Sequence, residues 1–287
     1  MKNFSFVTIG DKDFFHIITH SVKQVKKFYP EATFYIYDWG FNPQQVRRFS
    51  REPNVIIIDW KDRFTNVKSV ETTNWQKILV ERKLTRASTL KNKLKRCVEK
   101  CMFPIRVSQH KSRERLFCQK PYCLLDCANR CKGSMIYLDG DAFLINKVDE
   151  LMDFDIGVTL RRKNEITNEQ NNCQVLNAGV IIFGGSYKKN TTFIKEWINT
   201  MHSTHEYLIE QTALTRMIEK NNLGIYNDYY NTGTLEIEGM RIAVKILPCE
   251  IYNYNWIEEG VDKEKVKIVH FKNNRYKDKE LVKSILD

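Results

Sequence analysis

The sequence predicts an α/β protein with an open, mostly parallel, Rossmann-like sheet and helices packed on its faces. Three observations predict this class. Short apolar runs alternate with helical stretches, a polar turn follows each run, and one run leads directly into the acidic triplet Asp139-Gly140-Asp141. A chain of 287 residues can bury a sizeable core, and we expect one domain over residues 1–287.

The first 60 residues show the clearest alternation of strands and helices. Residues 4–9 (FSFVTI) predict a strand, and Gly10 and Asp11 then turn the chain into a helix over 12–28, which Pro30 ends. Further strands are expected at 33–37 and 55–58, with a short helix at 43–49 between them. In such sheets, ligands bind beyond the carboxyl ends of the strands.

The rest of the chain continues the pattern after a long helical insertion. Residues 77–132 are mostly helical in pattern, with an interruption expected near Pro104, and they lead into a strand at 135–138. The remaining predicted elements are strands at 156–160, 180–183 and 268–271, helices at 193–201 and 207–220, and a hairpin over 233–246.

Charge is concentrated in the segment 77–132, which also contains several cysteines. It holds sixteen Lys and Arg against four acidic residues, a net +12, so the rest of the +11 chain sums to −1. Such a basic block indicates an anionic partner, which could be nucleic acid, a membrane surface, or a phosphorylated or acidic substrate. A solvated helix face without a partner is an equally good interpretation.

Hydropathy gives no membrane-spanning segment. No apolar run approaches the length that crosses a bilayer, and charged residues soon follow the start MKNFSFVTIG, which therefore lacks the core of a signal peptide. We expect a cytoplasmic protein with reduced cysteines, in which the basic block is the segment that could hold it at a membrane surface.

The two carboxylates of Asp139-Gly140-Asp141 raise the question of what balances their charge. Burying one carboxylate costs several kcal/mol unless it is paired, and two like charges cost more. At a strand end, a D-x-D triplet can hold an oxygen-preferring divalent cation such as Mg²⁺ or Mn²⁺, which also binds phosphates. The alternative is a solvated turn in which both side chains act as caps.

Five segments in order resemble the GT-A glycosyltransferases, and in particular glycosyltransferase family 8, which includes glycogenin and bacterial lipopolysaccharide galactosyltransferases. The resemblance spans nearly the whole chain except the basic block. The segments are the D-x-D triplet, residues 175–180 (VLNAGV), Glu210-Gln211, Leu247-Pro248 with Tyr252-Asn253, and residues 268–271 (IVHF).

The resemblance implies a retaining hexosyltransferase that uses a nucleoside-diphosphate sugar, most simply a UDP-sugar. It implies Mn²⁺ or Mg²⁺ as cofactor, held by Asp139, Asp141 and His270. It also places Asn177 and Gly179 beside the donor sugar. The acceptor, whether glycan, lipid-linked or protein, is not specified.

The chain departs from the family at two positions near the reacting atoms. Glu210 stands where the family has Asp, and the residues after His270 lack the family's Gly and Lys-Pro-Trp, so Lys272 or Arg275 is left to supply a cation for the diphosphate. We expect Glu210 to lie nearest the anomeric carbon. It could act as general base in an inverting enzyme, whereas in a retaining enzyme Glu210 or Gln211 would stabilise the oxocarbenium face.

Other candidate donor contacts come from strand ends and from the basic block. Thr8, Asp11 and Asp59 lie where the base and ribose should rest, although ordinary turn chemistry explains them equally well. Lys120 matches a basic residue that often touches the donor in these folds, and one more solvated lysine is the plain alternative.

Two other functions remain open at this stage. A nucleic-acid-binding protein would use the basic segment 77–132 to contact phosphates, and a metal-dependent nucleotidyltransferase would use the paired carboxylates. Cysteines spaced by four residues could bind zinc or an iron–sulfur cluster, or could simply pack in the core. These cysteines are Cys97 and Cys101, and Cys123, Cys127 and Cys131.

Overall fold

The computed structural model describes most of the chain. The described residues are 4–84, 93–148, 153–161, 175–221, 229–255, 262–271, 280, 282 and 285, without the side chains of 80–84, 93–102, 221 and 263. In chain order the elements are β1 (Ser5–Asp11), α1 (Phe15–Phe28), β2 (Thr33–Gly40), α2 (Pro43–Ser50), β3 (Val55–Asp59), α3 (Lys68–Thr72), α4 (Trp75–Leu84), α5 (Lys93–Phe117), α6 (Lys120–Cys131), β4 (Met135–Leu138), β5 (Ala142–Leu144), β6 (Ile156–Leu160), β7 (Leu176–Phe183), α7 (Tyr187–Ser203), α8 (Ile209–Asn221), β8 (Thr232–Ile237), β9 (Met240–Pro248), α9 (Cys249–Tyr252), the 3₁₀ turn η5 (Lys263–Lys265) and β10 (Ile268–His270).

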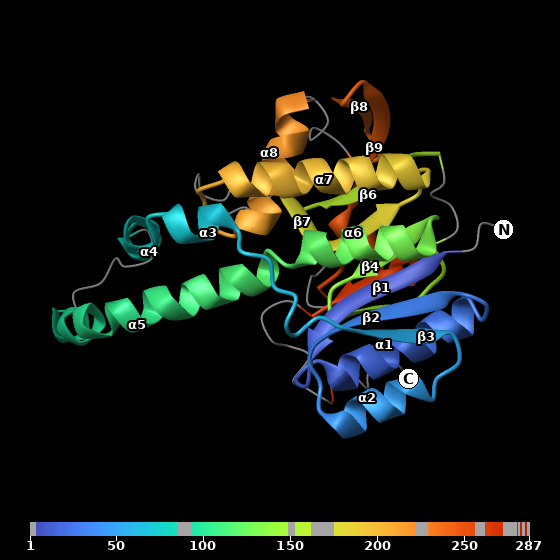
Figure 1. Cartoon of the computed structure of the whole chain (residues 1–287), viewed down its shortest axis with the longest axis horizontal. Coiled ribbons are helices and arrows are strands. Elements are labelled where there is room, and N and C mark those ends of the chain that lie inside the picture. The colour runs from blue at the N-terminus through green and yellow to red at the C-terminus, as the bar shows by residue number, and fades with distance from the viewer. Residues whose placement is uncertain are drawn as a thin grey trace.

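The central sheet has eight strands in the order β3-β2-β1-β4-β7-β6-β9-β8. The pairs β3–β2, β2–β1, β1–β4 and β6–β9 are parallel. Strand β7 is antiparallel to β4 and β6, and β8 is antiparallel to β9. Helices flank this sheet (Figure 1). The open, mostly parallel sheet predicted from the sequence is therefore confirmed.

Alternation along the strands builds two cores, one on each face of the sheet. On β1, Phe6 packs with α1 and α2 residues such as Val22, whereas its neighbour Val7 packs on the other face with α6 residues such as Leu124. Successive strand side chains point to opposite faces, so a run that is apolar at every position predicts a sheet covered on both sides. Figure 1 shows α1 and α2 on one side and α6 and α7 on the other.

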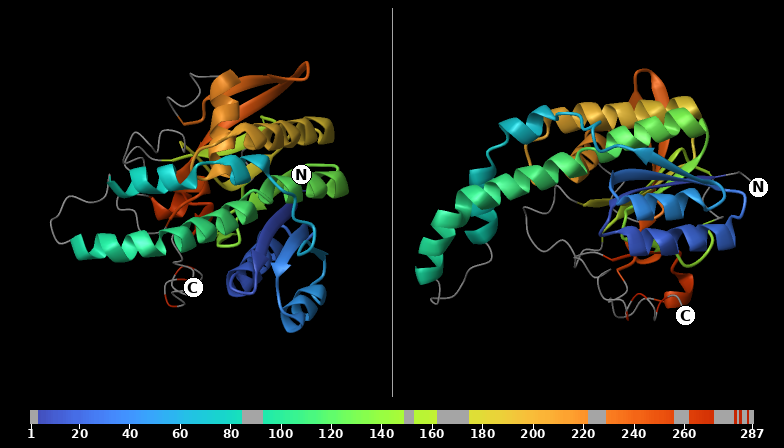
Figure 2. Two further views of the ribbon diagram at one scale, coloured as in Figure 1. Left: turned by 60° about the vertical axis from the view of Figure 1, so that its left-hand side comes forward. Right: turned by 60° about the horizontal axis from the view of Figure 1, so that its bottom comes forward.

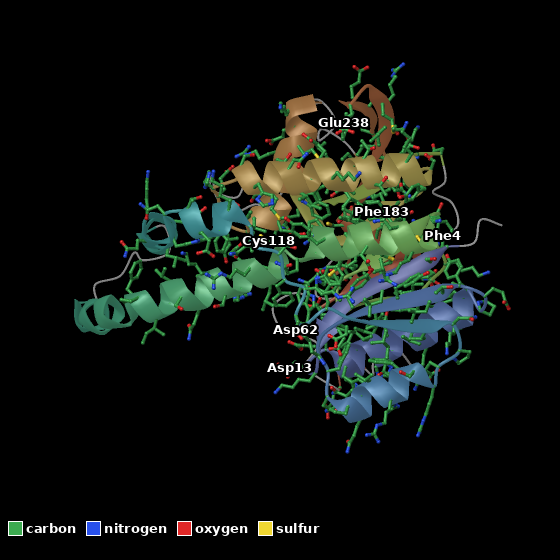
Figure 3. All side chains as sticks on the ribbon, in the orientation of Figure 1. Phe4, Asp13, Asp62, Cys118, Phe183 and Glu238 are labelled. Atoms are coloured by element: carbon green, nitrogen blue, oxygen red, sulfur yellow. The ribbon has the colours of Figure 1, made fainter. Side chains whose placement is uncertain are left out.

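The carboxyl ends of the parallel strands meet at one edge of the sheet. Asp13 and Asp62, which follow β1 and β3, lie at that edge, and Phe4, which precedes β1, lies at the opposite one (Figure 3). A second sheet, formed by β5 and β10, runs antiparallel. The strand predicted at 268–271 is thus present, but it pairs outside the main sheet.

Helices α4 and α5 form an arm that projects from the body of the molecule (Figures 1 and 2). The expected interruption near Pro104 was wrong, because α5 runs from Lys93 to Phe117 with Pro104 inside it. Proline removes one backbone hydrogen bond, and in a helix of this length the neighbouring turns retain theirs. Within the described part of the chain, no helix is both long and apolar enough to cross a membrane.

Local turn chemistry explains one shifted boundary. Helix α1 begins at Phe15 rather than at residue 12, since the Asp11 carboxylate accepts the Asp13 N–H (2.9 Å) and the Asp11 carbonyl accepts the Phe14 N–H (3.1 Å). These bonds hold residues 11–14 in a turn before the helix starts.

Candidate functional site

The Asp139-Gly140-Asp141 turn lies against the ends of two central strands. The Asp139 N–H donates to the Gly179 carbonyl of β7 (2.8 Å), and the Ala142 N–H donates to the Asp139 carbonyl (2.9 Å). A Cβ on Gly140 would lie 2.7 Å from the Ile9 carbonyl of β1, so only glycine fits there. The turn is therefore held rigidly while both carboxylates stay partly exposed.

His270 reaches these carboxylates through the small sheet. Strand β5 follows Asp141 directly and pairs with β10, which places His270 opposite Ala142. The His270 Nε2 atom lies 3.1 Å from Asp141 Oδ1 and 3.7 Å from Asp139 Oδ2. Within the described residues, these three form the one group of at least three potential ligands whose atoms all lie within 4.8 Å of one another.

Gly179 makes room for His270. A Cβ at this position would lie 2.3 Å from Cε1 and 2.5 Å from Nδ1 of the imidazole ring. The ring lies against β7 at this residue, and any side chain at residue 179 would displace it. The resemblance implies a donor sugar beside Gly179, and in this structure the group that lies against this glycine is the His270 ring.

Lys120 joins the turn to helix α8. Its Nζ atom lies 3.1 Å from Asp139 Oδ1 and 3.1 Å from Glu210 Oε1, and it donates to the Ala178 carbonyl (3.1 Å). The Tyr137 hydroxyl also donates to Asp139 Oδ1. Lys120 is buried, so its ammonium directs its three N–H groups inward rather than toward solvent.

Burial and the lysine charge together set the protonation of this group. Burial raises the pKa of Glu210 to about 7, and the nearby Lys120 only partly offsets that rise. Burial alone would also raise the pKa of Asp139. The interactions of this carboxyl with Lys120 and His270 are stronger than that effect, so its pKa is lowered. Although burial opposes the charge of Lys120, Asp139 and Glu210 hold its pKa above the ordinary value. The site thus contains one carboxyl whose pKa is lowered, Asp139, and one, Glu210, whose pKa is about 7.

Gln211 and Asn177 also lie at this edge. Gln211 Oε1 accepts the Ala178 N–H (3.4 Å), which places the side chain against β7. Asn177 Oδ1 accepts the Gly179 N–H (2.8 Å), so this oxygen already has a partner inside the protein. Both side chains therefore lie against the β7 backbone beside Gly179, and their contact with a donor sugar stays a prediction.

The predicted base and ribose contacts are more scattered. Thr8 is buried within β1, the Asp11 carboxylate holds the local turn, and Asp59 is exposed on β3, where it accepts the Lys61 N–H (3.1 Å). Strand β3 is three positions from β4, on the order of 14 Å across the sheet. Lys272 and Arg275 lie outside the described residues.

Three residues contribute side chains to the site although the sequence analysis gave them no role there. Tyr137 could have been found by strand periodicity, because it lies two residues before Asp139 and faces the same side. Thr159 and Asn253 come from β6 and from the segment after α9, and their side chains bond to each other (2.8 Å). No local pattern links residues so distant in sequence.

The cysteines of α6 do not form a comparable group. Cys123 and Cys127 are buried in the core on the α6 face, and burial raises the pKa of both thiols well above the usual value. Cys118 is also buried, at the junction of α5 and α6 (Figure 3). The side chains of Cys97 and Cys101 lie outside the described residues. Cys118, Cys123 and Cys127 therefore pack as apolar side chains.

Comparison with known proteins gives a structural likeness at low sequence identity. No family model and no curated protein matches the sequence. Among solved structures, the chain is similar to the galactosyltransferase LgtC in complex with donor and acceptor sugar analogs, with 13% identity and a TM-score of 0.47 over 94% of this chain and 87% of that chain. A likeness this weak does not assign a function, so the function is inferred from the site itself.

Proposed function

We propose that the protein is a metal-dependent glycosyltransferase of the GT-A type that transfers a sugar from a nucleoside-diphosphate sugar, most simply a UDP-sugar, to an acceptor hydroxyl. One observation carries the proposal. Asp139, Asp141 and His270 converge within 4.8 Å at the carboxyl edge of a mostly parallel sheet, where such sheets bind ligands. The family resemblance of the sequence motifs supports the same assignment.

The three side chains fit a divalent cation. They offer two carboxylate oxygens and one imidazole nitrogen from a partly exposed turn and a buried strand. This mixed donor set suits Mn²⁺ somewhat better than Ca²⁺, and Mg²⁺ is the second choice. Two like charges next to one another also become less costly when a cation lies between them.

The reaction breaks the bond between the anomeric carbon and the diphosphate oxygen. The acceptor oxygen forms the new bond to that carbon, its proton leaves, and the nucleoside diphosphate departs with the electron pair. When bound, the cation supplies positive charge to the diphosphate oxygens of the leaving group. Asp139, Asp141 and His270 would hold it, and the rigid Gly140 turn fixes the two carboxylates relative to β1 and β7.

Glu210 is the proposed catalytic carboxylate. With its pKa raised to about 7, it can exchange a proton near neutral pH, as a general base on the acceptor hydroxyl requires. In a retaining reaction, which the family resemblance favours, Glu210 or Gln211 would instead face the positive charge at the anomeric carbon. Lys120 holds Glu210 and Asp139 together through its two ion pairs. It would have to give up one of these contacts to touch the donor.

The basic segment 77–132, which includes helices α4 and α5, is the proposed contact for the acceptor or an anionic surface. It contains sixteen Lys and Arg and four acidic residues. Part of this charge is used internally, since Lys111 and Arg115 both pair with Glu71 of α3. The arm projects from the side of the molecule where Asp13 and Asp62 mark the strand ends, so it flanks the site (Figures 1 and 3).

The test is a screen of sugar nucleotides for hydrolysis with Mn²⁺ and with Mg²⁺, followed by NMR of the anomeric configuration of the released sugar. We expect one donor to be hydrolysed, with loss of activity in excess EDTA. Full turnover in EDTA contradicts the metal-dependent mechanism. Release of pyrophosphate from a nucleoside triphosphate would instead indicate a nucleotidyltransferase, and salt-dependent DNA binding without hydrolysis would indicate a nucleic-acid-binding protein.

The arm has its own test. Neutralising Lys91, Lys93, Lys95 and Arg96 together should leave donor hydrolysis intact, since that reaction needs only the sugar nucleotide and water. Transfer to the acceptor should weaken, and most at low salt, where screening is least. Equal loss of hydrolysis and transfer would show that the arm shapes the donor site. Loss of neither would leave the arm as a solvated face.

A further inference from the structure

We propose that Asn253 is a positioning residue that fixes the neutral tautomer of His270, with the proton on Nδ1 and the Nε2 lone pair facing Asp139 and Asp141. The consequence for metal binding rests on the proposed function, whereas the tautomer itself does not. The inference follows from hydrogen bonds whose direction is set by the backbone.

The direction of the network starts at two backbone groups. The Gly179 N–H can only donate, and it lies 2.8 Å from the Asn177 side chain, so the atom facing it is Oδ1. The Asn177 carbonyl can only accept, and the Thr159 hydroxyl donates to it (2.8 Å). Thr159 Oγ1 has then used its one proton and offers only lone pairs to its other neighbours.

The two acceptor atoms, Asn177 Oδ1 and Thr159 Oγ1, both face the side-chain amide of Asn253. One nitrogen of that amide lies 2.8 Å from Thr159 Oγ1 and 2.9 Å from Asn177 Oδ1. An oxygen there would face two acceptors with no proton between them, so the NH₂ group must occupy this position. The amide oxygen of Asn253 therefore points the other way, toward His270.

The histidine tautomer follows from the orientation of that amide. His270 Nδ1 lies 2.7 Å from Asn253 Oδ1, which can only accept, so Nδ1 must carry a proton. In the neutral ring Nε2 then carries only a lone pair, and because Asp141 Oδ1 lies 3.1 Å away, a proton or a cation has to lie between these two acceptors. That lone pair is the group that a metal ion requires of histidine.

Burial makes the network resistant to rearrangement. Asn253 and Thr159 are fully buried, and Asn177 and His270 are each 6% exposed, so solvent cannot easily replace these partners. A shift in the β6–β7 register between Val158 and Thr159 places Thr159 opposite Asn177. Reversing any member would leave buried polar atoms without partners.

The direct test is ¹⁵N NMR of His270 in the metal-free protein, at a pH where the ring is neutral. Free neutral histidine favours the Nε2–H tautomer, so the expected Nδ1–H form would be a property imposed by the fold. Asn253→Leu should shift the ring toward Nε2–H. Asn199→Leu, the same change at an exposed asparagine of α7, should leave the ring in the Nδ1–H form and is the control. An Nε2–H ring in the wild type, or an unchanged tautomer in Asn253→Leu, overturns the proposal.

Metal binding gives the second readout. EPR of free Mn²⁺ should show a dissociation constant about 10- to 100-fold higher for Asn253→Leu than for wild type, with the control Asn199→Leu equal to wild type. If the tautomer shifts as expected but the wild type binds neither Mn²⁺ nor Mg²⁺, the positioning role stands and the metal-dependent function fails.

A second pair of variants covers the case in which Asn253→Leu does not fold. Thr159→Val removes the hydroxyl at nearly constant shape, and Thr159→Ser keeps it. We expect the Nε2–H fraction to rise in the Val variant and to stay at the wild-type level in the Ser variant. The same tautomer ratio in both variants would show that the Thr159 hydroxyl does not orient the Asn253 amide, which would overturn the proposed network.

Discussion

The strand-end site and the cysteine face of α6 are both rich in potential metal ligands, yet only the first arranges them for binding. Asp139, Asp141 and His270 come from segments more than 120 residues apart in sequence and meet at a partly exposed turn. Cys123 and Cys127 are adjacent on one helix but point into the core, where burial raises their pKa. A ligand pattern becomes a site only where the side chains converge and can lose their protons.

The largest expected effect is that of Asp141→Asn. The variant should reduce sugar-nucleotide hydrolysis to background and abolish Mn²⁺ binding, because an amide oxygen lacks the charge that binds the cation. Circular dichroism should show an intact fold, since a like charge beside Asp139 has been removed. Asp153→Asn is the control, because Asp153 is an exposed carboxylate whose partner is Lys245. If the Asp141 variant kept activity near the wild-type level, the Asp139-Gly140-Asp141 turn would not be part of the catalytic site.

Gly179→Ala should have the next largest effect. The added Cβ would lie within 2.5 Å of the His270 ring, so the ring must move away from Asp141. We expect Mn²⁺ affinity to fall about tenfold or more, and the free energy of unfolding to fall by about 1–3 kcal/mol, as overpacking usually costs. Calorimetric titration and denaturant unfolding measure the two. Wild-type metal affinity in this variant would show that His270 is not a ligand.

Acidification should lower activity through two groups. His270 must be neutral to bind a cation, and Glu210, with its pKa raised to about 7, must be ionised to accept a proton. Activity should therefore fall as the pH drops through about 7. A pH profile of hydrolysis at saturating Mn²⁺ isolates the Glu210 component, and a flat profile there would exclude Glu210 as general base.

The stability effect of Glu210 has the opposite sign. Its pKa is raised in the folded state, so its favourable contribution is complete below the unfolded value of about 4.3 and is lost as the pH rises through about 7. Glu210→Gln cannot titrate. Its free energy of unfolding, measured with urea, should therefore fall less than that of wild type between about pH 4 and pH 7, by on the order of a few kcal/mol. Parallel curves would show that Glu210 is not strongly perturbed.

The cysteine face should give the smallest effects. Cys127→Ala should leave Mn²⁺ affinity unchanged and lower the free energy of unfolding by about 1 kcal/mol, as for other small core substitutions. Cys131, which is only partly buried, has its pKa lowered to about 6 by hydrogen bonding from Cys127. At neutral pH it should be alkylated before Cys118, Cys123 and Cys127, as mass spectrometry of peptides can show. Loss of metal binding in Cys127→Ala would show that the cysteine face of α6, rather than the strand-end site, binds the metal.

The sequence by itself predicted most of the strands and helices and three ligand candidates. Apolar runs such as VIII at 55–58 predicted strands because a short apolar run between turn residues is read directly from the chain. The acidic turn predicted a cation site because a cation between two neighbouring carboxylates lowers the cost of their like charges, with a solvated turn as the alternative. Pro104 was misjudged because a local rule about proline does not include the length of the helix around it.

Only the tertiary structure decided how these residues work together. It placed His270 beside Asp141 by pairing β10 with β5, turned Lys120 inward between Asp139 and Glu210, and kept Asp59 on a distant edge strand. It also joined Thr159, Asn177 and Asn253 into one directed network. The physical reason is that burial and hydrogen-bond direction depend on partners far away in sequence, whereas periodicity and turn chemistry depend on near neighbours.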